Sequence, residues 1–151
     1  MDRLIRGERS KLMGKIRGRD TKIERALYDQ LTKMGLEYQV RDIEGKPDYA
    51  HREAKVAVFI DGCFFHVCPE HCSIPKTNTG FWLKKFIRNS NRDLLVNAKL
   101  MASGWKVVRV WGHTVKKEPE RALEIIGTII KARMLIINII GRVPAGGIDY
   151  L

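Results

Sequence analysis

The segment from Lys55 to Ile60 constrains the fold more than any other part of this 151-residue sequence. It reads Lys-Val-Ala-Val-Phe-Ile, a nearly continuous apolar run that is rich in β-branched residues and ends at Asp61-Gly62. A strand with one solvated face alternates apolar and polar residues, whereas this run suits a central strand buried on both faces. The sequence therefore predicts an α/β fold in which helices flank a sheet.

The other expected elements surround that run. Thr21-Lys22-Ile23-Glu24 forms a capping box before apolar residues at helical spacing. The last residues of the helix expected over 118–140 are so β-branched that a strand is the alternative there. The expected helices cover 8–16, 21–34, 81–101 and 118–140, and the expected strands cover 36–41, 48–50, 55–60 and 105–111, with the first two strands paired as a hairpin. We expect one domain over 1–151, with a basic N-terminal arm over 1–19 and a C-terminal helical extension over 118–151.

The charge balance indicates a polyanionic partner. Lys and Arg number 28 against 17 Asp and Glu, a formal net charge of +11. Nucleic acid is the leading interpretation, with an anionic membrane surface or a merely soluble basic protein as alternatives. The charged start of the chain lacks the apolar core of a secretory signal, so we expect an intracellular, cytoplasmic and nucleoid-associated protein. Met134 to Ile140 is too short to span a bilayer and is expected in the core or in a subunit contact, in a monomer or weak dimer.

Three carboxylates are candidates for the hard oxygen ligands that a nuclease needs around a divalent cation. Glu24 lies in the first turn of a helix, Asp48 follows Pro47 at the start of a strand, and Asp61 ends the next strand. Adjacent strands can bring the two aspartates to one edge of a sheet. Each residue alone has an ordinary interpretation, because Glu24 completes a capping box and both aspartates stand where turns form. Together with the basic charge, they favour a metal site.

Three cysteines and two histidines crowd residues 63–72. In a reducing compartment such crowding favours a metal over a disulfide. A Cys-x4-Cys-x2-His run lies here and another histidine follows the strand over 105–111, so a closed tetrahedral site for a structural zinc ion is expected. Its candidate ligands are Cys63, Cys68, His71 and His113. Cys72 is the alternative to His71, and three buried free cysteines without metal is the remaining interpretation.

Five motifs resemble the very short patch repair (Vsr) endonucleases in order and approximate spacing, within a likeness from about Ser10 to His113. The motifs are Arg19-Asp20-Thr21-Lys22-Ile23-Glu24, Gly45-Lys46-Pro47-Asp48, Asp61-Gly62-Cys63-Phe64-Phe65-His66, Pro75-Lys76-Thr77-Asn78 and Phe81-Trp82. That family nicks DNA beside a T·G mismatch, and its fold resembles the PD-(D/E)xK restriction-type nucleases without their usual lysine. The resemblance implies a restriction-endonuclease-like core, a Mg²⁺-dependent, strand-specific DNA repair endonuclease, a double-stranded DNA substrate and a repair protein as a further partner.

The resemblance also implies roles for individual residues. Asp48 becomes the principal Mg²⁺ ligand, with the backbone carbonyl of Ile60 nearby, and Glu24 supports the hydrated metal. His66 takes the place of the catalytic histidine. Asp61 stands where a well-studied member has histidine, and is expected to add a direct metal ligand. The implied zinc ligands are Cys63, Cys68, His71 and His113.

DNA contacts are expected from two regions. Met13, Phe64 and Phe65 match positions at which the family drives apolar side chains into the base stack, a step that is least costly at a mispair. Burial in the core is the alternative for both phenylalanines. The basic residues Lys84, Lys85 and Arg88 are expected to contact phosphates. Two other functions fit the same residues, namely a restriction-like or structure-specific nuclease and a zinc-stabilised DNA-binding module without catalysis.

Overall fold

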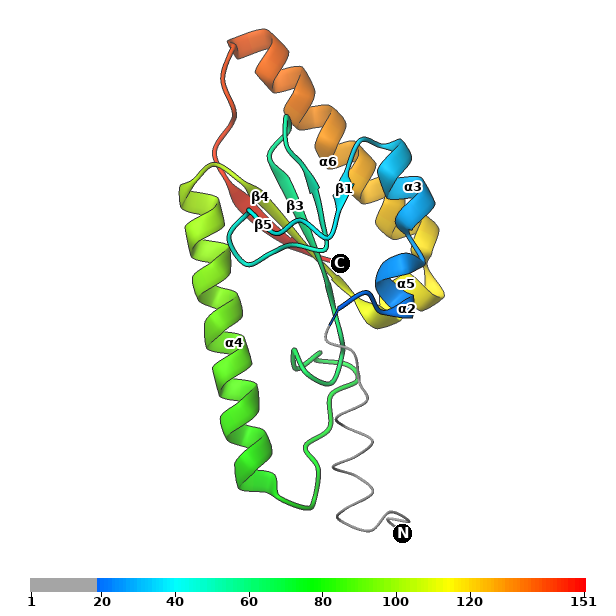
Figure 1. The fold of residues 1–151 in the computed structure, drawn as a ribbon, viewed down its shortest axis with the longest axis vertical. Helices are drawn as coiled ribbons and strands as arrows, with labels where there is room; N and C mark the ends of the chain where they lie inside the picture. The colour runs from blue at the N-terminus through cyan, green and yellow to red at the C-terminus, as the bar shows by residue number, and fades with distance from the viewer. Residues whose placement is uncertain (1–18) are drawn as a thin grey trace.

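The computed structural model describes residues 19–151, so the helix expected over 8–16 and Met13 lie outside the described residues. Its centre is a five-stranded sheet in the order β1-β2-β3-β4-β5 (Figure 1). The strands are β1 (Glu37–Tyr38), β2 (Tyr49–His51), β3 (Val56–Asp61), β4 (Lys106–Trp111) and β5 (Gly147–Tyr150). β1, β2 and β3 pair antiparallel, whereas β3, β4 and β5 pair parallel. The predicted α/β class, hairpin and central strand are confirmed.

Helices cover both faces of this mixed sheet (Figure 1). α4 (Thr79–Ala102) lies on one face, and α3 (Tyr28–Lys33) and α6 (Pro119–Ile140) lie on the other. Side chains alternate between the faces along β3, so Phe59 joins the core under α4 whereas Val58 joins the core under α3 and α6. Burial on both sides explains why this strand lacks polar alternation.

The helix expected over 21–34 is divided. α2 (Lys22–Arg25) is a single turn, and α3 begins at Tyr28 after a break at Ala26 and Leu27. At this break the hydroxyl of Tyr49 on β2 donates to the carbonyl of Glu24 at 2.5 Å. The prediction of one continuous helix was wrong, because periodicity does not reveal that the sheet satisfies a carbonyl at this point.

The C-terminal part contains two elements that the sequence did not predict. α5 (Gly112–Lys117) directly follows β4, and residues 147–150 return to the sheet as β5. α6 is helical as far as Ile140, so the strand alternative for its last residues was wrong. The buried guanidinium of Arg133 on α6 holds the returning segment by donating to four backbone carbonyls, those of Ala54, Gly104, Pro144 and Ala145.

The apolar segment Met134 to Ile140 forms the end of α6. Leu135 is 60% exposed and Ile139 is 71% exposed, so the segment is not a core element of this chain. A subunit contact there stays a prediction. Within residues 19–151, no helix has both the length and the apolarity needed to cross a bilayer.

Candidate active site and metal-binding cluster

Asp48 directly precedes β2 and lies beside the C-terminal end of β3. Its Oδ2 accepts the backbone N–H of Ile60 at 2.7 Å. Burial raises the pKa of Asp48 to about 7, and the charges of Glu24 and Asp61 add to this effect, which the hydrogen bond from Ile60 only partly offsets. Three carboxylates thus lie close together at one edge of the sheet, and the spacing of the strands predicted this for Asp48 and Asp61.

Glu24 completes the predicted capping box and is 5% exposed. Its two carboxylate oxygens accept the Thr21 hydroxyl at 2.9 Å and the Asp20 backbone N–H at 2.6 Å. Gly112 at the start of α5 allows α2 to come close, because a Cβ there would lie 3.3 Å from Ile23. Glu24 can therefore cap α2 and lie close to Asp48 at the same time.

The backbone around Asp48 is strained. Gln39 and Lys46 both have a φ of +54°, a left-handed conformation that non-glycine residues seldom adopt. Both line a small hollow beside Asp48, and the Gln39 N–H donates to the Asp48 carbonyl at 2.7 Å. Strained backbone concentrates at active sites and ligand clamps, where the surrounding structure over-determines it.

His66 lies in the loop after β3, between two carboxylates. Its Nδ1 is 2.7 Å from Oδ2 of Asp93 on α4 and 3.4 Å from Oδ1 of Asp61. Burial alone would raise the pKa of Asp93, but the hydrogen bond and charge of His66, with the charges of Arg109 and Arg92, lower it below its usual range. Asp93 is therefore an ionised acceptor for the imidazole ring.

Asp61 is paired with a buried arginine. Arg109 Nη1 donates to both Asp61 oxygens, at 2.9 and 2.7 Å, and both residues are almost fully buried. The carboxylate that was expected to add a metal ligand is thus occupied by a guanidinium. Asp61 still links the group around Asp48 to His66, because its charge acts on the first and its Oδ1 approaches the second.

Phe64 and Phe65 belong to an aromatic cluster between the loop and α4. The Phe64 ring meets those of Phe65, Trp82 and Phe86 edge-on, with centroids 5.2, 4.9 and 5.3 Å apart. The Lys85 ammonium lies 5.1 Å from the Phe65 centroid. Both phenylalanines are only half-buried, so neither belongs to the two buried cores of the described residues.

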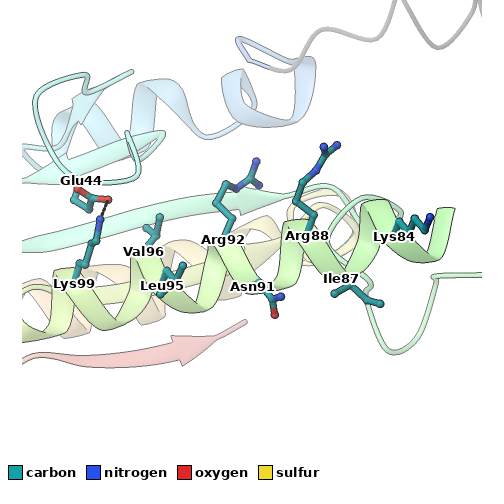
Figure 2. A pocket seen from close by; sticks show the side chains of 9 residues that line it. All are labelled: Glu44, Lys84, Ile87, Arg88, Asn91, Arg92, Leu95, Val96 and Lys99. Carbon is teal, nitrogen blue, oxygen red and sulfur yellow. Dashed lines mark hydrogen bonds and ion pairs between the residues drawn. The ribbon is translucent and has the colours of Figure 1, made fainter. Parts of the chain in front are cut away.

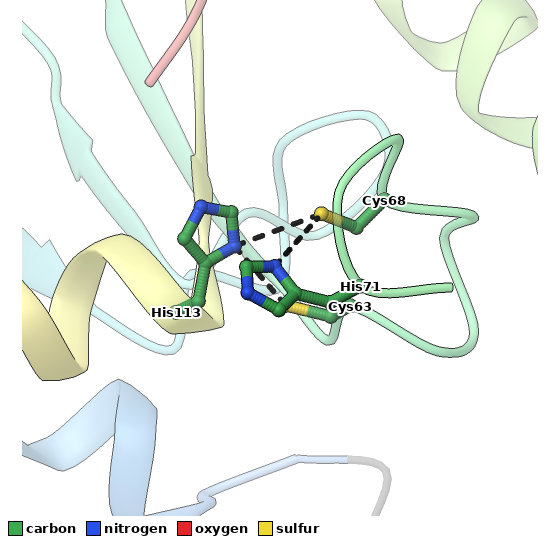
Figure 3. A group of neighbouring side chains, drawn as sticks. All are labelled: Cys63, Cys68, His71 and His113. Atoms are coloured by element: carbon green, nitrogen blue, oxygen red, sulfur yellow. Dashed lines mark hydrogen bonds between the residues drawn. The ribbon is translucent and has the colours of Figure 1, made fainter. Parts of the chain in front are cut away.

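Cys63, Cys68, His71 and His113 form a cluster whose ligand atoms all lie within 4.8 Å of one another (Figure 3). The His113 Nδ1 is 3.4 Å from the Cys63 sulfur and 3.6 Å from the Cys68 sulfur. Tetrahedral zinc, with bonds of about 2.3 Å to sulfur and about 2.0–2.1 Å to nitrogen, separates such ligands by roughly 3.5 Å. The cluster could hold a metal ion. Cys72 lies apart from it, and its thiol donates to the Phe64 carbonyl at 3.6 Å.

A groove of about 580 Å³ runs along α4. Lys84, Arg88 and Arg92 line it at four-residue spacing, and Lys99 at its end pairs with Glu44 (Figure 2). The sequence placed all three on the basic side of this helix but predicted phosphate contacts only for Lys84 and Arg88; Arg92 continues the row to Asp93, from which it is 3.2 Å away. The cationic row therefore begins beside the aromatic cluster and passes close to His66.

The structure brings together most of the predicted residues and adds two. Glu24, Asp48, Asp61 and His66 gather at one edge of the sheet. Asp93 was missed because it resembles any solvated helix position in the sequence. Arg109 was missed although it had a signal, since a lone arginine inside the Val-Val-Arg-Val run of a buried strand requires a buried anion.

The chain is similar to several DNA-cleaving enzymes. The profile of the family described as DNA mismatch endonuclease Vsr matches residues 1–73. The type II nicking enzyme V.NaeI of Lentzea aerocolonigenes is 45% identical over 113 residues, which cover 70% of this chain and 68% of that protein. V.HpaIIP of Haemophilus parainfluenzae, also a type II nicking enzyme, is 39% identical over 83% of this chain and 93% of its own length. DNA mismatch endonuclease Vsr of Escherichia coli K12 is 41% identical over 68% of each chain.

The fold and these similarities define a DNA nicking endonuclease with a restriction-endonuclease-like core. More specifically, the chain belongs to the Vsr family of DNA mismatch endonucleases. Family membership makes DNA its substrate and excludes the alternative of a DNA-binding module without catalysis.

Proposed function

We propose that this enzyme nicks one strand of duplex DNA at or next to a T·G mismatch, in DNA repair, and that the reaction requires Mg²⁺. The observation that carries the proposal is the state of Asp48. Its carboxyl has a pKa of about 7 because burial and the charges of Glu24 and Asp61 outweigh the opposing effects of the Ile60 N–H and the Arg19 charge. A divalent cation bound here would keep Asp48 ionised. It would also offset the repulsion between the carboxylates of Asp48 and Glu24.

The residues at this edge of the sheet fit Mg²⁺, which prefers hard oxygen ligands. Asp48 and Glu24 would hold the ion, with the backbone carbonyl of Ile60 as a further oxygen. When bound, Mg²⁺ polarises the scissile phosphate and lowers the pKa of water.

His66 is the proposed general base. Asp93 is ionised and can only accept, so the neutral ring of His66 carries its proton on Nδ1. Nε2 is then the nitrogen that can take a proton from the attacking water. The pair His66 and Asp93 thus orients a base next to the carboxylates, a role that a DNA-binding surface alone would not need.

A second candidate is nicking of duplex DNA at a site other than a T·G mismatch, because two of the relatives are named type II nicking enzymes. Both candidate functions require Mg²⁺-dependent cleavage of one strand, and duplexes labelled separately on each strand test that requirement. Cleavage of one strand with Mg²⁺ and none with a chelator supports a metal-dependent nicking site. Cleavage that persists in the chelator would contradict it.

The Cys and His cluster is the proposed structural zinc site. All four positions are filled by protein, so this ion would support the loop that carries Phe64 and His66 and would not take part in hydrolysis. Burial and the neighbouring Cys68 raise the pKa of Cys63, and a bound cation would oppose both effects by stabilising the thiolate.

Cys63→Ser should release zinc and destabilise the protein, because a closed site contributes folding free energy directly. A loss of about 3 kcal/mol, a modest share of what such sites contribute, would lower the Tm by roughly 6–12 °C. Elemental analysis and thermal melting measure both effects. Cys72→Ser is the matched control and should keep its zinc. Wild-type protein without zinc, or equal zinc loss in both variants, would contradict the proposed ligands.

The double variant Phe64→Ala/Phe65→Ala should reduce cleavage at a T·G site by at least roughly tenfold, because stacking on a base is typically worth about 1–3 kcal/mol. The charges of the predicted phosphate contacts Lys84, Lys85 and Arg88 would remain, so salt-dependent binding to ordinary duplex should change little. Tyr28→Ala, an exposed aromatic on α3, is the control. Unchanged T·G cleavage, or an equal loss of binding to all DNA, would assign the phenylalanines to packing.

A further inference from the structure

A buried arginine lies in the middle of the sheet. Arg109 stands between two valines on β4 and is 3% exposed. Besides its two bonds to Asp61, its Nε donates to the Asn97 side chain on α4 at 3.1 Å, and its guanidinium lies 4.7 Å from the Phe59 ring centroid. Asn97 in turn donates to the Tyr150 hydroxyl on β5 at 3.4 Å. The guanidinium is therefore held directly by α4 and β3, and Asn97 connects it to β5.

The same guanidinium reaches the two carboxylates that contact His66. Its Nη2 is 3.5 Å from Asp93 Oδ1, and its Nη1 binds Asp61. Two carboxylates so close to one imidazole nitrogen repel each other unless a cation compensates them. Arg109 supplies that cation and so holds both carboxylates beside the same imidazole ring.

Stability alone is a weak explanation for Arg109. The desolvation penalty of burying a guanidinium and a carboxylate is about as large as the energy of their attraction. Apolar side chains of similar volume can often replace such a pair without lowering the stability of the protein. A valine or isoleucine would continue the apolar pattern of β4. The position therefore carries a charge that packing does not require.

We propose that Arg109 is a positioning residue that acts on His66 through Asp61 and Asp93. The proposal rests on the proposed function of His66. By holding both carboxylates, Arg109 fixes the plane of the imidazole ring and keeps its proton on Nδ1. Both oxygens of Asp61 accept from Arg109, so this assigns Asp61 to ring positioning in place of the metal ligation that the family resemblance implied.

The experiment compares Arg109→Met, Arg109→Lys and the double variant Asp61→Asn/Arg109→Met with wild type. Small misplacements of a catalytic group can cost about a hundredfold in rate, so Arg109→Met should lower kcat by about that factor. Its KM for DNA should stay within a few fold, since Arg109 does not face solvent. Arg109→Lys keeps the charge without the planar fork, and should recover only part of kcat.

The double variant separates positioning from stability. It removes both buried charges, so it should regain the thermal stability that Arg109→Met loses, but not its kcat. Arg133→Met is the matched control, because it removes another buried guanidinium at the opposite ends of β3 and β4, and it should lose stability while keeping kcat. Recovery of kcat together with stability in the double variant, or an equal kcat loss in Arg133→Met, would overturn the proposal.

A spectroscopic readout makes the test independent of the proposed function. Long-range ¹H–¹⁵N spectra of the imidazole rings report which nitrogen of His66 is protonated. The wild type should show a single Nδ1–H tautomer, and the double variant should show a mixture. A wild-type protein that nicks no DNA would contradict the proposed function, whereas an unchanged tautomer in the double variant would contradict the positioning role.

Discussion

Asp48→Asn should abolish Mg²⁺-dependent nicking and, at the same time, stabilise the metal-free protein at pH 8. The loss of activity follows because an amide is a poor ligand for a hard cation that serves the transition state. The gain in stability follows because the folded protein raises the pKa of Asp48 from 3.8 to about 7. In wild type, the folded state binds more protons than the unfolded state between those two values, so stability falls as pH rises through that window.

The stability difference between variant and wild type should therefore be near zero at pH 4 and largest above pH 7. One pKa unit corresponds to about 1.4 kcal/mol. Solvent screens part of the electrostatic energy at Asp48, so the free energy of unfolding should differ by less than the full pKa shift implies. We expect a difference of about 2 kcal/mol, which corresponds to a Tm gain of about 4–8 °C.

Thermal melting at several pH values, with and without Mg²⁺, measures this effect. Added Mg²⁺ should raise the Tm of wild type and leave that of Asp48→Asn unchanged. Asp29→Asn, at an exposed aspartate of α3, is the control and should keep both activity and the wild-type response. Normal nicking by the folded Asp48→Asn variant would remove Asp48 from the catalytic site.

His66→Ala should lower kcat by about 10²–10⁴-fold, the range that a general acid or base contributes, without weakening DNA binding. Asp93→Asn should also lower kcat, by about a hundredfold or more, because an amide can donate to Nδ1 and thus favour the wrong tautomer. Single-turnover cleavage measures the rate of the chemical step, and a separate binding assay measures the affinity for DNA.

His51 provides the matched control for the histidine variant. Its Nδ1 accepts the backbone N–H of Ala54 at 3.1 Å in the turn after β2, so His51→Ala should keep kcat. Normal cleavage by His66→Ala would contradict the proposed base. Loss of cleavage in Asp93→Asn together with loss of the fold would make Asp93 a structural residue.

The central strand and the Cys and His cluster could be predicted because their signals are local. The Val56 to Ile60 run contains no polar residue, and two cysteines with a histidine share one short loop. His113 joins that loop because it follows the neighbouring parallel strand. The antiparallel pairing of β2 with β3 likewise brings Asp48 and Asp61 to one edge of the sheet.

Other features depend on contacts between distant segments, which no local pattern reveals. β5 is a four-residue strand that begins at a glycine, and its pairing with β4 is secured by the buried Arg133. Asp93 becomes a partner of His66 only because α4 packs against the loop that follows β3. The break between α2 and α3 likewise reflects the hydroxyl of Tyr49, which lies 25 residues away from Glu24 in the chain.

The most direct test of the central claim compares three duplex pools with the same randomised flanks and a single variable position, which carries T·G, T·A or C·G. Each strand is labelled separately, and the initial rate of cleavage is measured with Mg²⁺. The account predicts that one strand of the T·G pool is nicked at least roughly tenfold faster than either paired pool, because a mispair is the least costly site to unstack. Equal rates in all three pools, or cleavage of both strands, would contradict it.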